Sequence, residues 1–470
     1  MIEDLKPYPQ YKDSGLAWLG KVPAHWGIAR SKRLFRQRKE FAQSDDQQLS
    51  ATQAFGVIPQ ALYEQRTGYR VVKISMHLNK RKHVQADDFV ISMRSFQGGL
   101  ERAWAAGAIR SSYVVLEPGA EVSAGYFQHL FKSHQYINAL RATSDFIRDG
   151  QDLNFGNFCG VDLPLIPLQE QAAIARFLAW ATNRLDRAIR AKRRIIALLQ
   201  EQKQAIIHRA VTRGLDPFVP LKDSGIPWLG EIPVHWECRR FKFVARINSG
   251  QVDPNKSPFM ELALIAPNHI QSGSGRIIKL ETAAVQGARS GKYFARKGQI
   301  LYSKIRPSLR KATIAPCDCL CSADMYAIAP RANLLTSGYL HLLMLSHIFT
   351  KFAVDASMRV AMPKVNRAAL ADCILWYPKP EEQKLIHDSI EKRTAPFDSS
   401  IYHIEREVTL LREYRTRLIA DVVTGKLDVR EVAAGLPEEE LQDQSDVEAV
   451  YDADEAEDDA QSDLIDTAED

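Results

Sequence analysis

The sequence predicts an α+β protein in which two similar domains are separated by a pair of long antiparallel coiled-coil helices. Three observations lead to this fold class. A fifteen-residue motif occurs twice, two heptad patterns occur at nearly the same offset, and about 135 strand-rich residues separate each motif from the heptad pattern that follows it. The chain therefore carries an internal pseudo-twofold repeat, followed by a segment that composition predicts to be disordered.

The repeated motif opens each half of the chain. Residues 12–26 read KDSGLAWLGKVPAHW and residues 222–236 read KDSGIPWLGEIPVHW, with ten of fifteen positions identical. The offset of 210 residues is far longer than the period of a solenoid, so the repeat indicates a duplicated domain.

Two helical patterns repeat at an offset of 212 residues. The segments at 167–171 (PLQEQ) and 380–383 (PEEQ) each lead into apolar positions spaced alternately by four and three residues, as in a coiled-coil seam. Each seam could pack onto its own domain, but two seams of equal length favour mutual antiparallel pairing. The predicted seam residues are Leu185, Ile189, Ile196, Leu199, Ile206, Phe397, Ile401, Ile404, Val408, Leu411, Leu418 and Val422.

Polar residues mark both seams. Lys203 and Arg415 interrupt them at equivalent positions, where they either set the register or extend to the edge of the helix pair. Pro396 predicts that the second helix begins near it, because proline is tolerated in a first helical turn. Thr394 is then the expected N-cap, and the repeat assigns Thr182 the same place in the first helix.

The repeat divides the chain into five segments. We predict a first domain at 1–162, a helical spacer at 163–213, a second domain at 214–374, a second spacer at 375–430 and an acidic tail at 431–470.

The net charge of +5 conceals an uneven distribution. Residues 431–470 hold 17 Asp and Glu and no Lys or Arg, which leaves 62 basic against 40 acidic residues in the rest of the chain. A body with this excess of 22 positive charges suggests a polyanionic partner. The tail has three interpretations: a disordered solubility segment, which composition favours, a docking segment, or an intramolecular mimic of DNA.

Basic and polar residues follow the predicted strands 88–92, 112–116, 299–303 and 324–328 of the two domains. Such side chains suit phosphates, and some of them can also read base edges. The predicted DNA-binding residues are Lys73, Lys80, Arg81, Arg94, Gln97, Arg102, Arg148, Arg289, Lys292, Lys304, Arg306, Arg310, Lys311 and Arg359.

The sequence lacks the usual catalytic motifs. It contains no P-loop, no complete dinucleotide-binding motif and no amino-methyltransferase tetrapeptide. The E-x-K tripeptides at 201–203 and 382–384 lie in helical patterns and are interpreted as structural. Cys317, Cys319 and Cys321 have spacing that favours free thiols over zinc, so we expect no catalytic residue, metal or cofactor in this chain. The repeated His25 and His235 are interpreted as scaffold residues.

Targeting features are also absent. No apolar run approaches the length of a membrane span, the start lacks a secretory signal, and six cysteines are too few for a disulfide framework. We therefore expect a cytoplasmic protein with no membrane partner.

The doubled layout resembles the specificity (S) subunit of Type I restriction–modification systems. The resemblance rests on the two KDSG motifs, on the LPLIPLQEQ and ILWYPKPEEQ segments before the helices, and on LYSKIRPSLRKATIAP in the second domain. It covers about residues 8–430 and leaves the acidic tail outside.

The resemblance implies a non-catalytic DNA-recognition subunit that serves defence against foreign DNA. Each domain would read one half of a bipartite target in double-stranded DNA, and the helices would set the gap between the halves. The subunit would recruit two modification subunits, which use S-adenosylmethionine to methylate adenine, and two restriction subunits, which use ATP and Mg. The exposed Arg190, Arg193 and Arg194 would then face a partner subunit and not DNA.

Two other hypotheses remain open from the sequence. A stand-alone two-domain DNA-binding regulator fits the same features without partner subunits. A scaffold protein held together by its coiled coil fits the seams but leaves the basic body unexplained.

Overall fold

The computed structural model describes residues 5–71, 80–92, 95–143, 153–357 and 363–437. Compact contacts divide the chain into two units. Unit 1 comprises residues 1–193 and 406–470, and unit 2 comprises residues 194–405. The division passes through both long helices, so each unit contains one half of each helix.

Unit 1 combines helices and short strands. Its four-stranded sheet has the order β4-β11-β8-β9, and two-stranded pairs join β1 with β2, β3 with β12, β5 with β6, and β7 with β10. The strands are β1 (Tyr11–Asp13), β2 (Lys21–Pro23), β3 (Gly27–Ala29), β4 (Phe35–Arg38), β5 (Leu49–Thr52), β6 (Gly56–Pro59), β7 (Lys82–Val84), β8 (Phe89–Ile91), β9 (Glu101–Arg102), β10 (Gly107–Ile109), β11 (Val114–Pro118) and β12 (Leu163–Leu165). The short helices are α1 (Ser31–Leu34), α2 (Gln60–Thr67), α3 (Ser95–Gly98), α4 (Ala124–Leu130), α5 (His134–Arg141), α6 (Phe155–Cys159) and α13 (Arg430–Ala434).

Unit 2 repeats this skeleton and adds a larger sheet. The sheet β16-β24-β21-β22 corresponds to β4-β11-β8-β9, and a five-stranded sheet has the order β17-β20-β23-β18-β19. The strands are β13 (Leu221–Asp223), β14 (Glu231–Pro233), β15 (Glu237–Arg240), β16 (Ala245–Ile247), β17 (Gln251–Val252), β18 (Ala263–Ile265), β19 (Glu281–Thr282), β20 (Lys292–Ala295), β21 (Ile300–Ser303), β22 (Ala312–Ile314), β23 (Cys319–Cys321), β24 (Met325–Pro330) and β25 (Ile374–Tyr377). The helices are α8 (Phe241–Val244), α9 (Ser337–Leu345), α10 (His347–Asp355) and α11 (Arg367–Asp372), with 3-10 turns η2 (Phe259–Glu261), η3 (Pro267–His269) and η4 (Pro307–Leu309).

The α+β class and the internal repeat are thus confirmed, and so are the four predicted strands, which appear as β8, β11, β21 and β24. The helical stretches at 124–141 and 337–355 are each divided in two. Ser133 and Ser346 divide them, because each side-chain hydroxyl caps the following helix, accepting from the backbone N–H of Tyr136 and Phe349 respectively.

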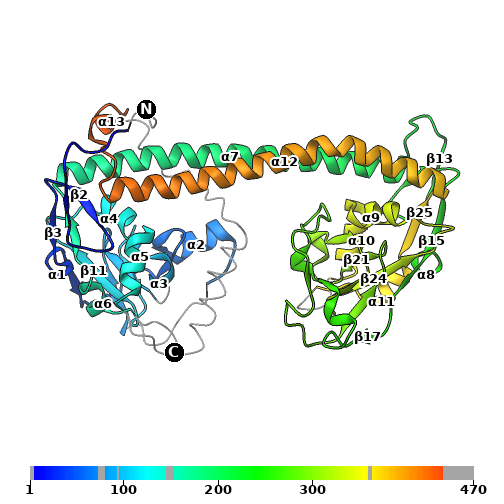
Figure 1. Ribbon diagram of the computed structural model, residues 1–470, viewed down its shortest axis with the longest axis horizontal. Coiled ribbons are helices and arrows are strands. Elements are labelled where there is room, and N and C mark those ends of the chain that lie inside the picture. The colour runs from blue at the N-terminus through cyan, green and yellow to red at the C-terminus, as the bar shows by residue number, and fades with distance from the viewer. Residues whose placement is uncertain (1–4, 72–79, 93–94, 144–152, 358–362, 438–470) are drawn as a thin grey trace. The chain divides into compact units, whose positions relative to one another are not determined.

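Two long helices, α7 (Leu168–Arg213) and α12 (Pro380–Val423), pair antiparallel within each unit (Figure 1). The expected starts near Thr182 and Thr394 are wrong. Thr182 lies inside α7, where its hydroxyl donates to the carbonyl of Leu178, and Pro396 lies inside α12. The helices begin earlier because their first turns are anchored in the domain cores, as Ile174 and Ile386 show by their complete burial.

The predicted seam residues lie on the enclosed side of these helices. Six of them are buried and the other six are half-buried, whereas the off-seam Ile195, Leu198 and Leu410 are exposed. The buried seam residues are Leu185, Ile189, Ile401, Val408, Leu418 and Val422, and the half-buried ones are Ile196, Leu199, Ile206, Phe397, Ile404 and Leu411.

The residues that interrupt the seams form equivalent ion pairs across the helix pair. In unit 2 the Nζ of Lys203 lies 2.5 Å from Oδ1 of Asp398, and in unit 1 the Nε of Arg415 lies 3.4 Å from Oδ1 of Asp186. Both pairs follow the 212-residue offset, which favours the hypothesis that they set the register.

A glutamate at the start of each long helix, buried in unit 1 and half-buried in unit 2, binds the repeated motif. In unit 1 the carboxylate of Glu170 accepts from Trp26 Nε1 at 2.9 Å and lies 2.7 Å from His25 Nε2. In unit 2 Glu382 makes the same contacts with Trp236 and His235, at 3.1 and 2.7 Å. The two segments that repeat separately in the sequence therefore meet in space.

The glutamine that follows each of these glutamates also binds the domain. The side chain of Gln171 bonds the backbone of Ser123, Glu121 and Ile166, at 2.8 Å in each case. Gln383 makes the corresponding bonds to Thr336, Leu334 and Pro378 at 2.7 to 2.8 Å. This explains the E-x-K match at 382–384 as structural, as the sequence indicated.

The far end of each helix closes the opposite domain. In unit 1 the hydroxyl of Tyr126 donates to the carbonyl of Val423 at 2.8 Å, and in unit 2 Trp376 Nε1 donates to the carbonyl of Val211 at 2.6 Å. Each domain core therefore includes the first turns of one long helix and the last turns of the other.

The first residues of the predicted tail are folded. Ala433 and Leu436 are 2 % and 5 % exposed and pack in the core of unit 1, around the short helix α13. The predicted boundary at Glu431 is therefore seven residues too early, because the apolar residues of 432–436 were grouped with the acidic residues that follow them.

We expect Glu170→Ala to lower the free energy of unfolding of unit 1 by about 2–4 kcal/mol, because the buried indole N–H of Trp26 loses its acceptor. The matched control is Gln169→Ala, which changes the exposed neighbour of Glu170 in the same part of α7, and it should cost below about 0.5 kcal/mol. Urea unfolding followed by tryptophan fluorescence measures both, and equal losses would contradict this role of Glu170.

Candidate nucleic-acid interface

Unit 1 contains a cleft of about 1400 Å³ between its domain and the helix pair. The walls come from the β5–β6 turn, α2, β9, the junction of α4 and α5, and the facing parts of α7 and α12. Eight of the described lining residues are Lys or Arg and four are Asp or Glu. This balance favours an anionic ligand.

An arginine and a tryptophan form one wall of the cleft. The guanidinium of Arg102 lies over the ring of Trp104, 4.3 Å from its centroid, and Trp104 is 47 % exposed. Arg102 is held in place by Asp87, whose Oδ1 accepts from Nε at 2.9 Å, and by Gln128, whose Oε1 accepts from Nη1 at 3.1 Å. A fixed guanidinium stacked on an exposed indole can contact a phosphate or a base face.

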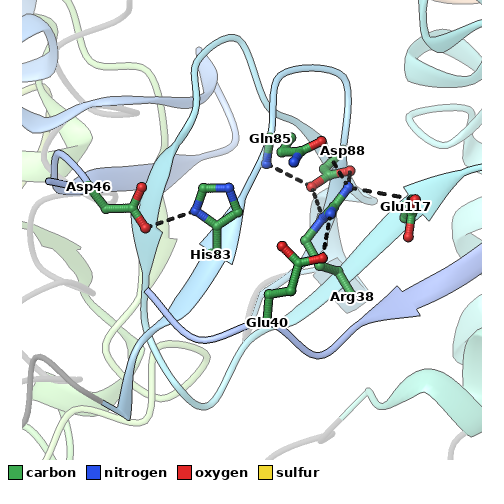
Figure 2. A network of polar contacts seen from close by, with 7 residues as sticks. All are labelled: Arg38, Glu40, Asp46, His83, Gln85, Asp88 and Glu117. Atoms are coloured by element: carbon green, nitrogen blue, oxygen red, sulfur yellow. Dashed lines mark hydrogen bonds and ion pairs between the residues drawn. The ribbon is translucent and has the colours of Figure 1, made fainter. Parts of the chain in front are cut away.

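A buried ion pair supports the turn that holds Arg102. Figure 2 shows Arg38 of β4 bound to Asp88, with Nε 2.8 Å from Oδ2. The two side chains are 6 % and 1 % exposed, so their charges are stable only because other groups complete the hydrogen bonding. The backbone N–H of Gln85 donates to Asp88, which fixes the turn at 85–88 and presents Asp87 in a left-handed conformation, with φ of 72°. The remaining partners of Arg38 are Glu40, Gln85 and Glu117.

A second pair lies beside the first in Figure 2. The Nδ1 of His83 on β7 is 2.8 Å from Oδ2 of Asp46, which ties this strand to the preceding loop. Burial raises the pKa of the Asp88 carboxyl, although Arg38 acts in the opposite direction. Both pairs lie behind the surface, and we interpret them as supports of the cleft wall.

A histidine occupies the same position in each unit, and the sequence analysis missed it. His129 in α4 and His341 in α9 are 212 residues apart. Burial lowers the pKa of each imidazole to about 4, and the positive charges of Arg415 and Arg102 add to the effect at His129. At His341 the hydrogen bond with the carbonyl of Ala312 opposes the burial. Both histidines are therefore neutral at pH 7.

In unit 2 the basic side chains gather on the loop around η4. Arg306 and Arg310 flank this turn with φ angles of 45° and 48°, a conformation that L-residues other than glycine adopt at a cost of about 1–3 kcal/mol. Backbone bonds hold the loop, since the N–H of Arg306 donates to Pro363 and the N–H of Gly273 donates to the carbonyl of Arg310. The Nη1 of Arg310 is buried and has no hydrogen-bond partner among the described residues.

The predicted DNA-binding residues occupy different environments. Lys73, Arg94, Arg148 and Arg359 lie outside the described residues. Lys80, Gln97, Arg289 and Arg306 are exposed, and Arg102, Lys304, Arg310 and Lys311 are half-buried. Arg81 and Lys292 are 6 % and 8 % exposed, so they do not present their charges to solvent, and Lys292 turns to the oxygens of Ser290. Within unit 1, the cleft includes Arg102 from this set.

Several lining residues of the cleft were not predicted. They include Arg66, Trp104 and Lys132 from the domain, and Arg190 and Arg412 from the helices. The sequence did offer a signal for Trp104, because this aromatic residue lies two positions after Arg102. The sequence did not show that Arg190 and Arg412 line the cleft, because a heptad pattern does not indicate which outer face of a helix packs toward the domain.

Other residues of nucleophile or metal-ligand type lie outside the cleft. Cys319 and Cys321 are buried free thiols on β23, and burial raises the pKa of each to about 12, while Cys317 is exposed. His387, Asp388 and Glu391 bring three ligand-type atoms within 4.8 Å of one another on α12, but both carboxylates are exposed to solvent. None of the helices in the described ranges combines the length and apolar character that a bilayer crossing needs.

Known proteins resemble this chain in sequence and in fold. It is 29 % identical over 305 residues to the type I restriction enzyme EcoDI specificity subunit of Escherichia coli, covering 62 % of this chain and 66 % of the relative. It is 24 % identical over 288 residues to the type I restriction enzyme MjaVIII specificity subunit of Methanocaldococcus jannaschii, covering 58 % and 64 %. The matches thus span just under two thirds of these relatives.

A solved structure shares the fold. A chain from a study of complex assembly and conformational transition in a type I restriction–modification system aligns with a TM-score of 0.55 and 16 % identity, covering 86 % of this chain and 99 % of its own. No protein-family model matches the chain.

We expect stability to fall as pH decreases from 6.5 to about 4. Unfolding returns His129 and His341 to the ordinary pKa near 6.5, so below that value the unfolded chain binds protons that the folded chain does not. Each histidine should cost about 1–2 kcal/mol by pH 5. Urea midpoints at pH 7.5 and 5 measure this, and the double variant His129→Gln, His341→Gln should show a smaller pH dependence. An unchanged dependence would show that other groups cause it.

Proposed function

We propose that this chain, a homologue of type I restriction enzyme specificity subunits, is the non-catalytic subunit that directs such an enzyme to DNA. Its two domains would each read one half of a bipartite target, from the cleft of unit 1 and the basic loop of unit 2. Modification and restriction would be carried out by partner subunits, which would bring S-adenosylmethionine, ATP and Mg.

The observation that carries this proposal is that one skeleton is repeated with different basic surfaces. The glutamate contacts, the four-stranded sheets and the helix ends are equivalent in the two units. The surfaces differ, since unit 1 presents Arg102 and Trp104 in a cleft and unit 2 presents the strained loop at 304–311. A repeated frame with divergent contact residues is what the recognition of two unlike half-sites requires.

The helix pair would serve two further purposes. Because α7 and α12 connect the two domains, we infer that their length sets the gap between the half-sites. Their outer faces carry exposed apolar residues that suit a protein partner: Ile195, Leu198, Leu410 and Tyr414. We infer that modification subunits bind there.

A stand-alone regulator is the second candidate, and the basic surfaces fit it equally. Neighbouring genes distinguish the two hypotheses. Genes for an adenine methyltransferase and a helicase-nuclease beside this gene would favour the specificity subunit over the regulator. Steep loss of DNA binding with salt supports either of them over a scaffold that binds no DNA.

We expect recognition to be modular. Residues 30–162 are exchanged for those of a relative, so that β3 and β12, which pair with each other, both stay in place. Residues 241–373 are exchanged in a reciprocal variant that keeps β15 and β25. Mapping methylated adenines in cells with the partner subunits should show one half-site changed in each case, and a change in both halves would contradict the proposal.

We expect the gap to follow helix length. Seven residues inserted after Leu199 and seven after Ile401 preserve both heptad patterns, because the ion pairs place these positions opposite each other. Each helix grows by about 10 Å, close to the rise of three base pairs. Methylome mapping should show both half-sites intact and the gap about three base pairs longer, whereas the same insertion after Pro437 should leave it unchanged. An unchanged gap in the variant with lengthened helices would show that the helices do not set the distance between the half-sites.

A further inference from the structure

We propose that the acidic segment 438–470 is the ligand of the cleft of unit 1 when no DNA is bound. This inference rests on the proposed function, because it names what occupies the same surface in the absence of DNA. The segment would act as an intramolecular competitor that target DNA displaces.

The charges of the segment and the cleft are complementary. The segment has 16 Asp and Glu among its 33 residues and no Lys or Arg. The described lining of the cleft carries four more basic than acidic side chains. Arg66 forms no ion pair with a described carboxylate and lies 5.5 Å from the ring centroid of Phe55, whereas the charge of Arg190 acts on Asp186 one turn earlier in α7. Carboxylates of the segment can thus pair with Arg66 and add to the single carboxylate near Arg190.

The segment starts from a fixed point on unit 1. Val429, Ala433 and Leu436 are buried in its core, and Nη2 of Arg176 donates to the carbonyl of Leu436. A chain of 33 residues has a root-mean-square span of about 30 Å even when it is flexible, and charge repulsion extends it. Unit 1 up to residue 437 has an expected radius of gyration of about 17 Å, so the segment can reach the cleft.

Because the acidic segment is attached to unit 1, it is close to the basic cleft of that unit. Both units are basic, but the segment leaves unit 1 directly after α13. A tether of this length holds its carboxylates at an effective concentration in the millimolar range around unit 1. Weak ionic contacts are then sufficient for occupancy, and a DNA ligand with more phosphates in fixed positions can replace them.

The first test compares the full chain with a chain that ends at Pro437. This end point keeps α13 and its buried residues, which an end at Arg430 would remove. Fluorescence anisotropy with a duplex of random sequence at 50 mM NaCl should show about tenfold tighter binding by the shortened chain, and the difference should vanish at 500 mM NaCl. Equal affinity at low salt would overturn the inference. Absence of binding by both chains would instead overturn the proposed function, and the inference with it.

Two controls distinguish the effects of the segment's charge and binding site from the effect of its length. One variant keeps all 470 residues but replaces the six acids of 452–459 by their amides, and it should bind DNA more like the shortened chain. In the other, a labelled peptide of residues 438–470 is added to the shortened chain. Arg66→Ser with Arg190→Ser should weaken peptide binding at least fivefold, whereas Arg289→Ser with Arg296→Ser in unit 2 should leave it unchanged. Equal weakening by both pairs would show unspecific attraction and would overturn docking in the cleft.

Discussion

The carboxylate at the start of each long helix is the interaction on which the rest of the structure depends. Glu170 and Glu382 are held by the indole and imidazole of the motifs that precede their domains, so each domain is closed by its own helix. The buried carboxylate of Glu170 is stable because the indole of Trp26 and the imidazole of His25 both hydrogen-bond to it. The same contact in both units makes the two domains copies of one frame.

The two glutamate sites differ in the residues around them. In unit 1 Tyr8 adds a third donor to Glu170 at 2.7 Å, and the guanidinium of Arg430 covers its ring. At the matching position of unit 2, Phe218 is 90 % exposed, because the chain there runs directly from α7 into the second motif. The segments near both chain ends thus complete unit 1 together, as the bridge between Lys6 and Asp428 also shows. The acidic segment continues from this closure.

The sequence was sufficient to predict the features that occur in both halves of the chain. The two motifs, the seams and the strands β8, β11, β21 and β24 follow from periodicity and from apolar runs. It was not sufficient for helix starts, because Pro396 gave a local signal that the packing of Ile386 and Ile390 in the core overrides. Nor could charge alone separate the buried Arg81 and Lys292 from the exposed Arg289. The cleft depends on side chains from distant segments, such as Arg66 and Arg412, which only the fold brings together.

The central claim is that two sibling domains read two separate half-sites. A genome-wide map of methylated adenines in the native host, repeated after deletion of this gene, tests it most directly. The account predicts a motif of two unlike specified halves around a gap of fixed length and unspecified sequence, and this motif should vanish with the gene. A single continuous motif, or methylation that persists without the gene, would contradict the account.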